Sequence, residues 1–209
     1  MGQALNVKLY LITDEECLQG KDLFRTVEEA LQAGVTLVQY REKNGQGGAM
    51  LQKAVALRTL CHQYGVPLLV NDRLDIALLA GADGVHLGQS DLPVAEARKL
   101  AGPDFLIGAT AHNVAEAIKA QRDGADYLGC GAVFTTVTKK DTVPLGLEGL
   151  RLICETVKIP VVGIAGVTAE NYPAVLPAGA EGDAVISAIL GQADVKAAVA
   201  AFLQAFDHK

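Results

Sequence analysis

The chain has 209 residues, of which 50% are hydrophobic and only 5% aromatic, a composition typical of a folded core rich in Ala, Val and Leu. Its formal net charge is -6 and it has no basic run with interleaved aromatics, which argues against a nucleic-acid partner. The sequence contains neither a signal-like start nor an apolar run long enough to span a bilayer, so we expect a cytoplasmic protein without a membrane partner.

Eight apolar runs that end in polar residues recur along the chain and are typical of buried strands. Segments with helical spacing lie between them, for example Leu51, Val55, Leu57 and Leu60, or Ala115, Ala117, Ile118 and Gln121. The predicted strands span residues 8–14, 37–43, 68–72, 84–89, 106–111, 127–134, 161–166 and 183–189. Strict alternation of strand and helix predicts a parallel sheet covered by helices.

The residues that separate these units also follow a repeating pattern. Helix-ending glycines precede the even-numbered strands, at Gly34, Gly81, Gly124 and Gly179. Each strand and helix pair occupies about 26 residues, which favours a single (β/α)8 TIM barrel of the α/β class over an open sheet. No linker interrupts the series, so residues 1–209 are expected to form one catalytic domain. The four cysteines form no C-x-x-C pair and are expected to be reduced.

The active site of such a barrel lies at the carboxyl ends of the strands. The second strand ends with Gln39, Arg41 and Lys43 at alternate positions, so these side chains share one face and point into the mouth. Two cations there suit a polyanion. The alternative is a solvated strand end in which Arg41 and Glu42 form local ion pairs.

The third strand ends with Asn71 and Asp72, and Asp91 follows the fourth strand, so two carboxylates lie at the same rim. Mg²⁺ prefers one or two carboxylates together with water and substrate phosphate oxygens, so this pair indicates a magnesium site. The alternatives are that Asp72 pairs with Arg73 and that Asp91 caps the helix beginning near Pro93.

The later strands offer hydroxyls and backbone amides. Thr110 ends the fifth strand, whereas His112 and His86 are expected to be structural, His86 as a satisfied core histidine. After the sixth strand comes a loop with Thr136, Thr138 and Lys139, which suits an anion, although a plain polar turn is the alternative. Gly166 and Ser187 belong to the last two predicted strands, where barrels commonly bind phosphate through N–H groups.

Taken together, these residues resemble the thiamine phosphate synthase family from Tyr10 to Ser187. The resemblance is carried by Gln39-x-Arg41-x-Lys43, Asn71-Asp72, Gly84-Val85-His86-Leu87-Gly88-Gln89-x-Asp91, Thr136-x-Thr138-Lys139-Lys140-Asp141 and Ile186-Ser187. Jointly these motifs are highly specific. Three positions depart from the family pattern: Thr110 replaces the usual Ser and keeps its hydroxyl, Thr135 replaces Pro, and Ala165 replaces the first Gly of a pair.

The resemblance implies two small-molecule substrates and a bound Mg²⁺. It implies that Mg²⁺ is held by Asp72 and Asp91, and that a thiazole phosphate is held by Thr136, Val137, Thr138, Gly166, Ile186 and Ser187. Hydroxymethylpyrimidine diphosphate would be held by Gln39, Tyr40, Arg41, Glu42, Lys43, Asn71 and Lys139, and Thr110 is a further expected substrate-binding residue. Among these, the expected catalytic residues are Arg41, Lys43, Thr110 and Lys139.

The expected reaction joins the two substrates to thiamine phosphate and releases diphosphate, with CO2 from a carboxylated thiazole. A thiazole tautomerase of the same superfamily, using a base such as His112, is one alternative, and a non-catalytic thiazole-phosphate sensor is another. A tautomerase has no use for the combination of Asn71, Asp72, Asp91, Thr138 and Lys139, which favours the synthase. The sequence leaves the oligomeric state open, a homo-oligomer included.

Overall fold

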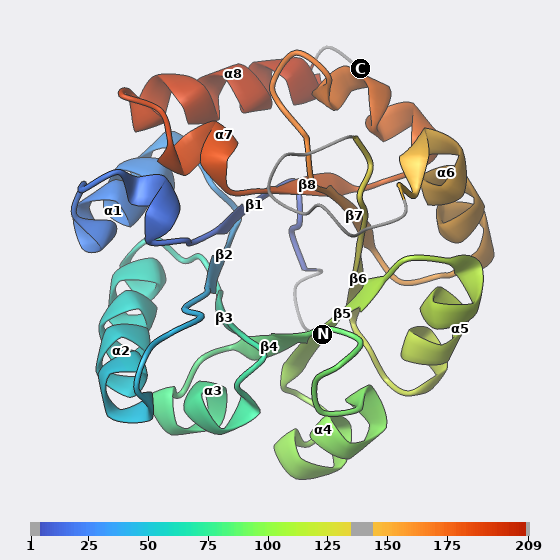
Figure 1. Ribbon diagram of the computed structural model, residues 1–209, viewed down its shortest axis with the longest axis horizontal. Coiled ribbons are helices and arrows are strands. Elements are labelled where there is room, and N and C mark those ends of the chain that lie inside the picture. Colours follow the sequence, from blue (N-terminus) through green and yellow to red (C-terminus); the bar gives the residue numbers. More distant parts are fainter. Residues whose placement is uncertain (1–4, 135–143, 208–209) are drawn as a thin grey trace.

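The computed structural model describes residues 5–134 and 144–207, which form a closed barrel of eight parallel strands. Neighbouring strands pair in chain order, and β8 closes the ring on β1 through the register Tyr10 to Ala184. The helices surround this ring (Figure 1). The predicted (β/α)8 TIM barrel is therefore confirmed.

Strands and helices alternate throughout the described residues. The strands are β1 (Leu9–Ile12), β2 (Leu37–Tyr40), β3 (Leu68–Asn71), β4 (Gly84–Leu87), β5 (Leu106–Ala111), β6 (Tyr127–Cys130), β7 (Val161–Ile164) and β8 (Gly182–Val185). The α-helices are α1 (Leu23–Ala33), α2 (Gly47–Gln63), α3 (Leu74–Ala80), α4 (Val94–Ala101), α5 (Val114–Arg122), α6 (Gly146–Thr156), α7 (Ser187–Leu190) and α8 (Val195–Asp207). Short 3-10 helices span Glu16–Leu18, Tyr172–Ala174 and Leu176–Ala178. None of these helices is long and apolar enough to cross a membrane.

Several strands end before the predicted residue, with β2 ending at Tyr40, β6 at Cys130 and β7 at Ile164. The eighth differs most: a strand was predicted over 183–189, but α7 begins at Ser187. There the amide of Leu190 donates to Ile186 O and that of Gly191 to Ser187 O, which are helical bonds. A short apolar run fits a buried helix as well as a strand, so periodicity alone did not separate them.

Local signals explain where the helices begin and end. The carboxylate of Asp22 accepts the amide of Arg25 at the start of α1, and the side chain of Asn113 accepts the amide of Glu116 at the start of α5. The left-handed glycines Gly34, Gly81 and Gly179 end their helices as predicted. The fourth predicted cap, Gly124, has φ +99 one residue beyond the end position of α5.

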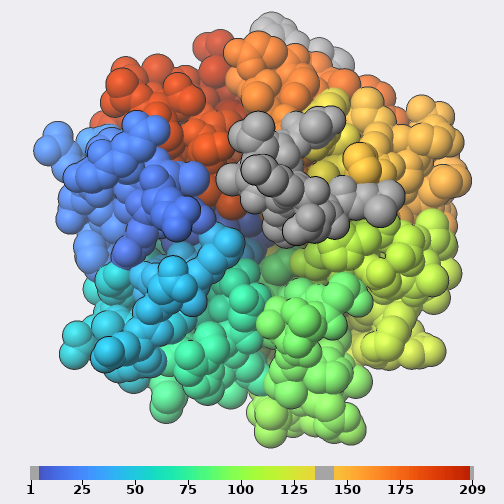
Figure 2. Space-filling model, viewed as in Figure 1, coloured from blue at the N-terminus to red at the C-terminus, as the bar shows by residue number. Residues whose placement is uncertain are grey.

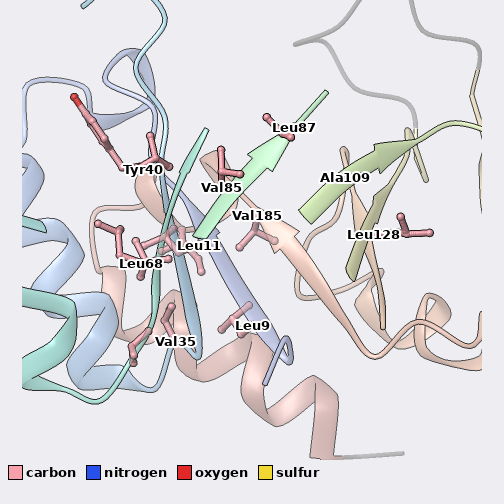
Figure 3. Close-up of a cluster of buried hydrophobic side chains, with 14 of the residues drawn as sticks. Leu9, Leu11, Val35, Tyr40, Leu68, Val85, Leu87, Ala109, Leu128 and Val185 are labelled. Atoms are coloured by element: carbon pink, nitrogen blue, oxygen red, sulfur yellow. The ribbon is translucent and has the colours of Figure 1, made fainter. Parts of the chain in front are cut away.

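Alternate strand residues build two separate hydrophobic layers. Outward-facing residues pack under the helices, and Figure 3 shows part of this outer layer, with Leu9, Leu11, Leu68 and Val85 labelled. Inward-facing residues fill the barrel with Val7, Tyr10, Ile12, Leu37, Leu69, Tyr127, Val162 and Ala184. Burial on both faces explains why the strands are almost continuously apolar.

The predicted inner faces of two helices were partly wrong. Helix α2 buries Met50, Ala54, Leu57 and Cys61, while Val55 is 44% exposed. On α5, Ala117 is buried as predicted and Ile118 is exposed. Alanines occur on all sides of these helices, so the sequence determines poorly which face of the helix is buried. All four cysteines are free, as predicted.

The amino end of the barrel is closed by the segment before β1. Val7 belongs to the inner layer, Leu5 packs against it, and the missing Cβ of Gly182 would lie only 1.9 Å from Val7 O. This segment crosses the centre of the ring in Figure 1. Figure 2 shows the same view with atoms filled in, where successive strand and helix units follow one another around the molecule. A ligand site inside the ring must therefore open toward the carboxyl ends.

Candidate active site

The side chains at the end of β2 divide between the barrel interior and the rim. Gln39 is 1% exposed, and its amide Nε2 donates to the Tyr10 hydroxyl inside the barrel, so its predicted inward direction is confirmed. Arg41 Nη1 lies 2.5 Å from the Oδ2 of Asp14, which follows β1. Lys43 is exposed and has no hydrogen bond or ion pair with the described residues. The arginine is thus held in place, while the lysine is open to a ligand.

Two neighbours of these residues point elsewhere. Tyr40 packs in the outer layer, where Figure 3 labels it, and its hydroxyl has no partner among the described residues. The Glu42 Oε2 lies 3.1 Å from Lys53 Nζ on α2. The ion pairs of the alternative are present, since Arg41 pairs with Asp14 and Glu42 with Lys53, but neither side chain is well solvated. Substrate binding by Tyr40 and Glu42 stays a prediction. Because the Tyr40 side chain packs in the outer layer, a contact between Tyr40 and a substrate would involve its backbone.

Asp72 and Asp91 face one another at the rim between β3 and β4. Burial and the adjacent Asp91 carboxylate raise the pKa of Asp72 to about 6, against opposing effects of the Asn71 side chain and the Arg41 charge. The Asp72 backbone has a left-handed φ of +61, and its amide donates to His86 O at 2.8 Å. Two carboxylates held this close repel each other unless a proton or a cation lies between them.

Neither alternative proposed for these aspartates holds in the structure. Arg73 pairs with Asp75, at 2.6 Å between Nη2 and Oδ2, rather than with Asp72. Asp91 Oδ2 accepts the amide of Gly88 at 2.7 Å, and α4 begins without a side-chain cap. Both aspartates are therefore left available to a cation.

The pair fits Mg²⁺ by its donor chemistry. Within residues 5–134 and 144–207 no group of three or more His, Cys, Asp and Glu side chains could hold a metal ion. Magnesium does not require such a cage, because it commonly takes one or two carboxylates and completes its shell with water and substrate phosphate oxygens.

A chain of hydrogen bonds crosses the barrel interior below these residues. The hydroxyls of Tyr10 and Tyr127 are 2.7 Å apart, and the Tyr127 hydroxyl lies 2.8 Å from His86 Nδ1. His86 Nε2 lies 3.0 Å from Thr110 Oγ1. His86 is thus a satisfied core histidine, as predicted, and its chain of partners joins Thr110 on β5 to Gln39 on β2.

The other histidine singled out by sequence is also structural. His112 Nδ1 lies 3.0 Å from Glu116 Oε2, and the His112 amide donates to the same oxygen at 2.8 Å. Asn113, rather than His112, caps α5. The histidine is therefore engaged in holding the start of this helix.

The ends of β7 and β8 carry the predicted phosphate-binding backbone. Ala165 and Gly166 have left-handed φ angles of +73 and +74, and a Cβ on Gly166 would lie 2.8 Å from Phe134 Cβ. The Phe134 amide donates to Ala165 O at 3.2 Å, which ties the chain after β6 to this turn. Ile186 is half-buried and Ser187 is exposed at the start of α7. The turn therefore positions Phe134, which precedes the predicted anion loop.

Four predicted site residues, Thr136, Val137, Thr138 and Lys139, lie outside the described residues, as does Thr135. Sequence reasoning also missed three residues that contact the site: Asp14, Tyr10 and Tyr127. The available signal was their place on strands, because Tyr10 and Tyr127 are polar residues at inward positions and Asp14 follows β1 next to the end of β2. Pairing them required knowing which strands adjoin.

Comparison with known proteins identifies the family to which this chain belongs. A family model described as thiamine monophosphate synthase matches residues 9–189. The chain belongs to the thiamine monophosphate synthase family. A thiamine-phosphate synthase from Ruminiclostridium cellulolyticum is 46% identical over 209 residues, covering 100% of both chains. One from Clostridium novyi is 51% identical over 195 residues, covering 93% of this chain and 96% of the relative.

The solved structures agree with this family assignment. A thiamine phosphate pyrophosphorylase from Pyrococcus furiosus has a TM-score of 0.91 and 42% identity, and the match covers 98% of each chain. A structure described as native KDPGal has a TM-score of 0.73 but only 18% identity, so it shares the barrel alone. The family resemblance seen in the sequence motifs is therefore confirmed.

Proposed function

We propose that this protein is a transferase that joins 4-amino-2-methyl-5-(diphosphooxymethyl)pyrimidine to a thiazole phosphate, giving thiamine phosphate and diphosphate. The observation that carries this proposal is the identity of 46% over the full length of a relative named thiamine-phosphate synthase. The tautomerase and sensor alternatives are not favoured, because the relatives reported above carry the synthase name or its synonym.

The proposed reaction is a displacement at the pyrimidine methylene carbon. The bond from this carbon to the diphosphate oxygen breaks, and its electron pair leaves with diphosphate. The thiazole nitrogen supplies the pair for the new carbon–nitrogen bond. A carboxylated thiazole also loses CO2, and the ring carbon keeps the electron pair of the broken bond and takes up a proton from water. No protein nucleophile is needed, so the chain's residues act on charge and orientation.

Arg41 and Lys43 are suited to hold the diphosphate at the rim. Arg41 is oriented by Asp14, and Lys43 is exposed beside it. Asp72 and Asp91 would hold Mg²⁺, which when bound supplies positive charge for the leaving diphosphate. Gln39, Asn71 and Thr110 would bind the pyrimidine substrate. Lys139 is proposed to face the diphosphate, and Thr136, Val137, Thr138, Gly166, Ile186 and Ser187 to bind the thiazole phosphate.

One assay tests the proposal against its alternatives. The protein is incubated with both substrates and Mg²⁺, and thiamine phosphate is measured. We expect product only when both substrates are present, and loss of turnover in EDTA. Isomerisation of the thiazole alone would identify a tautomerase, and tight binding without turnover would identify a sensor.

A further inference from the structure

The hydrogen-bonded chain inside the barrel links two residues proposed to contact the pyrimidine substrate. It runs from Gln39 on β2 through Tyr10, Tyr127 and His86 to Thr110 on β5. Tyr10 and Tyr127 are at most 1% exposed and His86 is 8% exposed. Buried polar groups need partners, so each link in this chain constrains the next.

Two glycines inside the barrel leave space for this hydrogen-bonded chain. A Cβ on Gly108 would lie 2.2 Å from the Tyr127 ring, and a Cβ on Gly129 would lie 3.1 Å from His86 Cε1. Both glycines occupy inward positions, on β5 and β6. Any larger residue at Gly108 would displace the tyrosine, which indicates that the interior is shaped around these rings.

With the Gln39 amide as the first donor, one direction of the chain gives every hydroxyl hydrogen an acceptor. Gln39 Nε2 donates to the Tyr10 oxygen, so the hydrogen of the Tyr10 hydroxyl needs an acceptor, and the Tyr127 oxygen is at hydrogen-bond distance. Burial raises the pKa of both tyrosines, which keeps each hydroxyl protonated. The hydrogen of Tyr127 is then left for His86 Nδ1.

The same reasoning continues to the far end of the chain. A neutral imidazole whose Nδ1 accepts carries its hydrogen on Nε2, which then donates to Thr110 Oγ1. The hydroxyl hydrogen of Thr110 remains available for another acceptor. At the opposite end, Gln39 Oε1 has no hydrogen-bond partner among the described residues and remains available as an acceptor.

We propose that Tyr10, Tyr127 and His86 are positioning residues whose one-way hydrogen-bond chain makes Gln39 an acceptor and Thr110 a donor toward the substrate. Gln39 would then select a substrate group that donates, such as the exocyclic amino group of an aminopyrimidine. Thr110 would donate to a substrate oxygen or ring nitrogen. The identity of the substrate rests on the proposed function, whereas the direction of the chain does not.

The direction is tested on the ligand-free protein by nitrogen-15 NMR of labelled histidine. The His86 signals are assigned by their loss in the variant His86→Asn, and the couplings to ring protons report which nitrogen carries hydrogen. We expect hydrogen on Nε2 alone. Hydrogen on Nδ1 alone, or on both nitrogens, would overturn the proposed direction.

Two variants separate positioning from simple packing. Tyr127→Phe removes the donor to His86 Nδ1, so its imidazole should populate the other tautomer. Tyr10→Phe leaves the links from Tyr127 to His86 and Thr110 intact, so the Nε2 tautomer should persist. Tyr172→Phe is the matched control, because it removes a buried hydroxyl that donates to Lys8 O outside the barrel.

The same variants are assayed for turnover. Tyr127→Phe should lower kcat/KM for the pyrimidine diphosphate by about tenfold, the effect of one misplaced hydrogen bond, and leave the KM for the thiazole phosphate near its original value. Tyr172→Phe should change neither. Equal loss for both substrates, or an unchanged His86 tautomer in Tyr127→Phe, would contradict a positioning role. If the original protein makes no thiamine phosphate, the proposed function fails while the NMR result still decides the direction.

Discussion

Asp183 on β8 offers a sharp test of how burial controls stability in this barrel. The residue is 0% exposed, and neither carboxylate oxygen has a hydrogen-bond partner among the described residues. Its side chain lies against β7, since a Cβ on Gly163 would be 2.2 Å from Asp183 Oδ1 and 2.9 Å from Val175 Cγ1. Burial raises its pKa well above the ordinary value of 3.8, which favours the neutral carboxyl in the folded protein.

This raised pKa makes the free energy of unfolding depend on pH with a known sign. Stability from the protonated carboxyl is complete below the unfolded pKa of 3.8 and is lost as the pH rises toward the folded pKa. Each pH unit in that range costs about 1.4 kcal/mol. Asp183→Asn keeps the shape and removes the titration. The stability of Asp183→Asn relative to the original protein should therefore be greater at about pH 7 than at about pH 5.

The measurement is urea unfolding of both proteins at these two pH values, with Asp104→Asn, an exposed aspartate, as control. The control should show no comparable growth, because the Asp104 side chain is exposed to solvent in the folded chain, as it is in the unfolded chain. A gap between Asp183→Asn and the original protein that is equal at both pH values would refute the reasoning. It would mean that Asp183 is ionised in the folded state.

Three further predictions concern the site. Asp72→Asn should raise the Tm of the metal-free protein, because it relieves the repulsion between two carboxylates. It should also abolish any increase of the Tm with Mg²⁺ and lower kcat by about a hundredfold. A lower Tm of the metal-free variant would contradict this prediction. Gly166→Val should raise the KM for the thiazole phosphate and leave that for the pyrimidine diphosphate unchanged, because its Cβ strains a left-handed backbone and displaces Phe134. Parallel increases in both constants would point to general distortion. Arg41→Gln should raise the KM for the pyrimidine diphosphate about tenfold or more, while Arg25→Gln, which breaks an exposed ion pair on α1, should leave kinetics intact.

The fold was predictable because alternating apolar strands and helices leave few arrangements that bury both faces of a parallel sheet. The first and last residues of the helices and strands were harder to predict. Residues 186–189 are apolar except for Ser187 and fit either structure, and only the helical hydrogen bonds of α7 decide between them. Likewise, Val55 was expected to be buried, but Ala54 and Leu57 occupy the inner face of α2.

The features of the site that depend on a single strand could be predicted from the sequence. The contacts between residues of two different strands could not. The inward direction of Gln39 follows from strand alternation, and the carboxylates Asp72 and Asp91 were placed at one rim because they end neighbouring strands. The ion pair of Arg41 joins residues 27 positions apart, and the hydroxyls of Tyr10 and Tyr127 meet across 117 positions. Such pairs arise only when the barrel closes.

Phosphorus-31 NMR of the reaction tests the central claim most directly, because it observes both phosphorus-containing products at once. With both substrates and Mg²⁺ present, the pyrimidine diphosphate signals should decay while free diphosphate and thiamine phosphate appear in equal amounts. Neither product should form when one substrate is omitted. Release of diphosphate without thiamine phosphate, or no change in either substrate, would contradict the assignment of this barrel as a thiamine phosphate synthase.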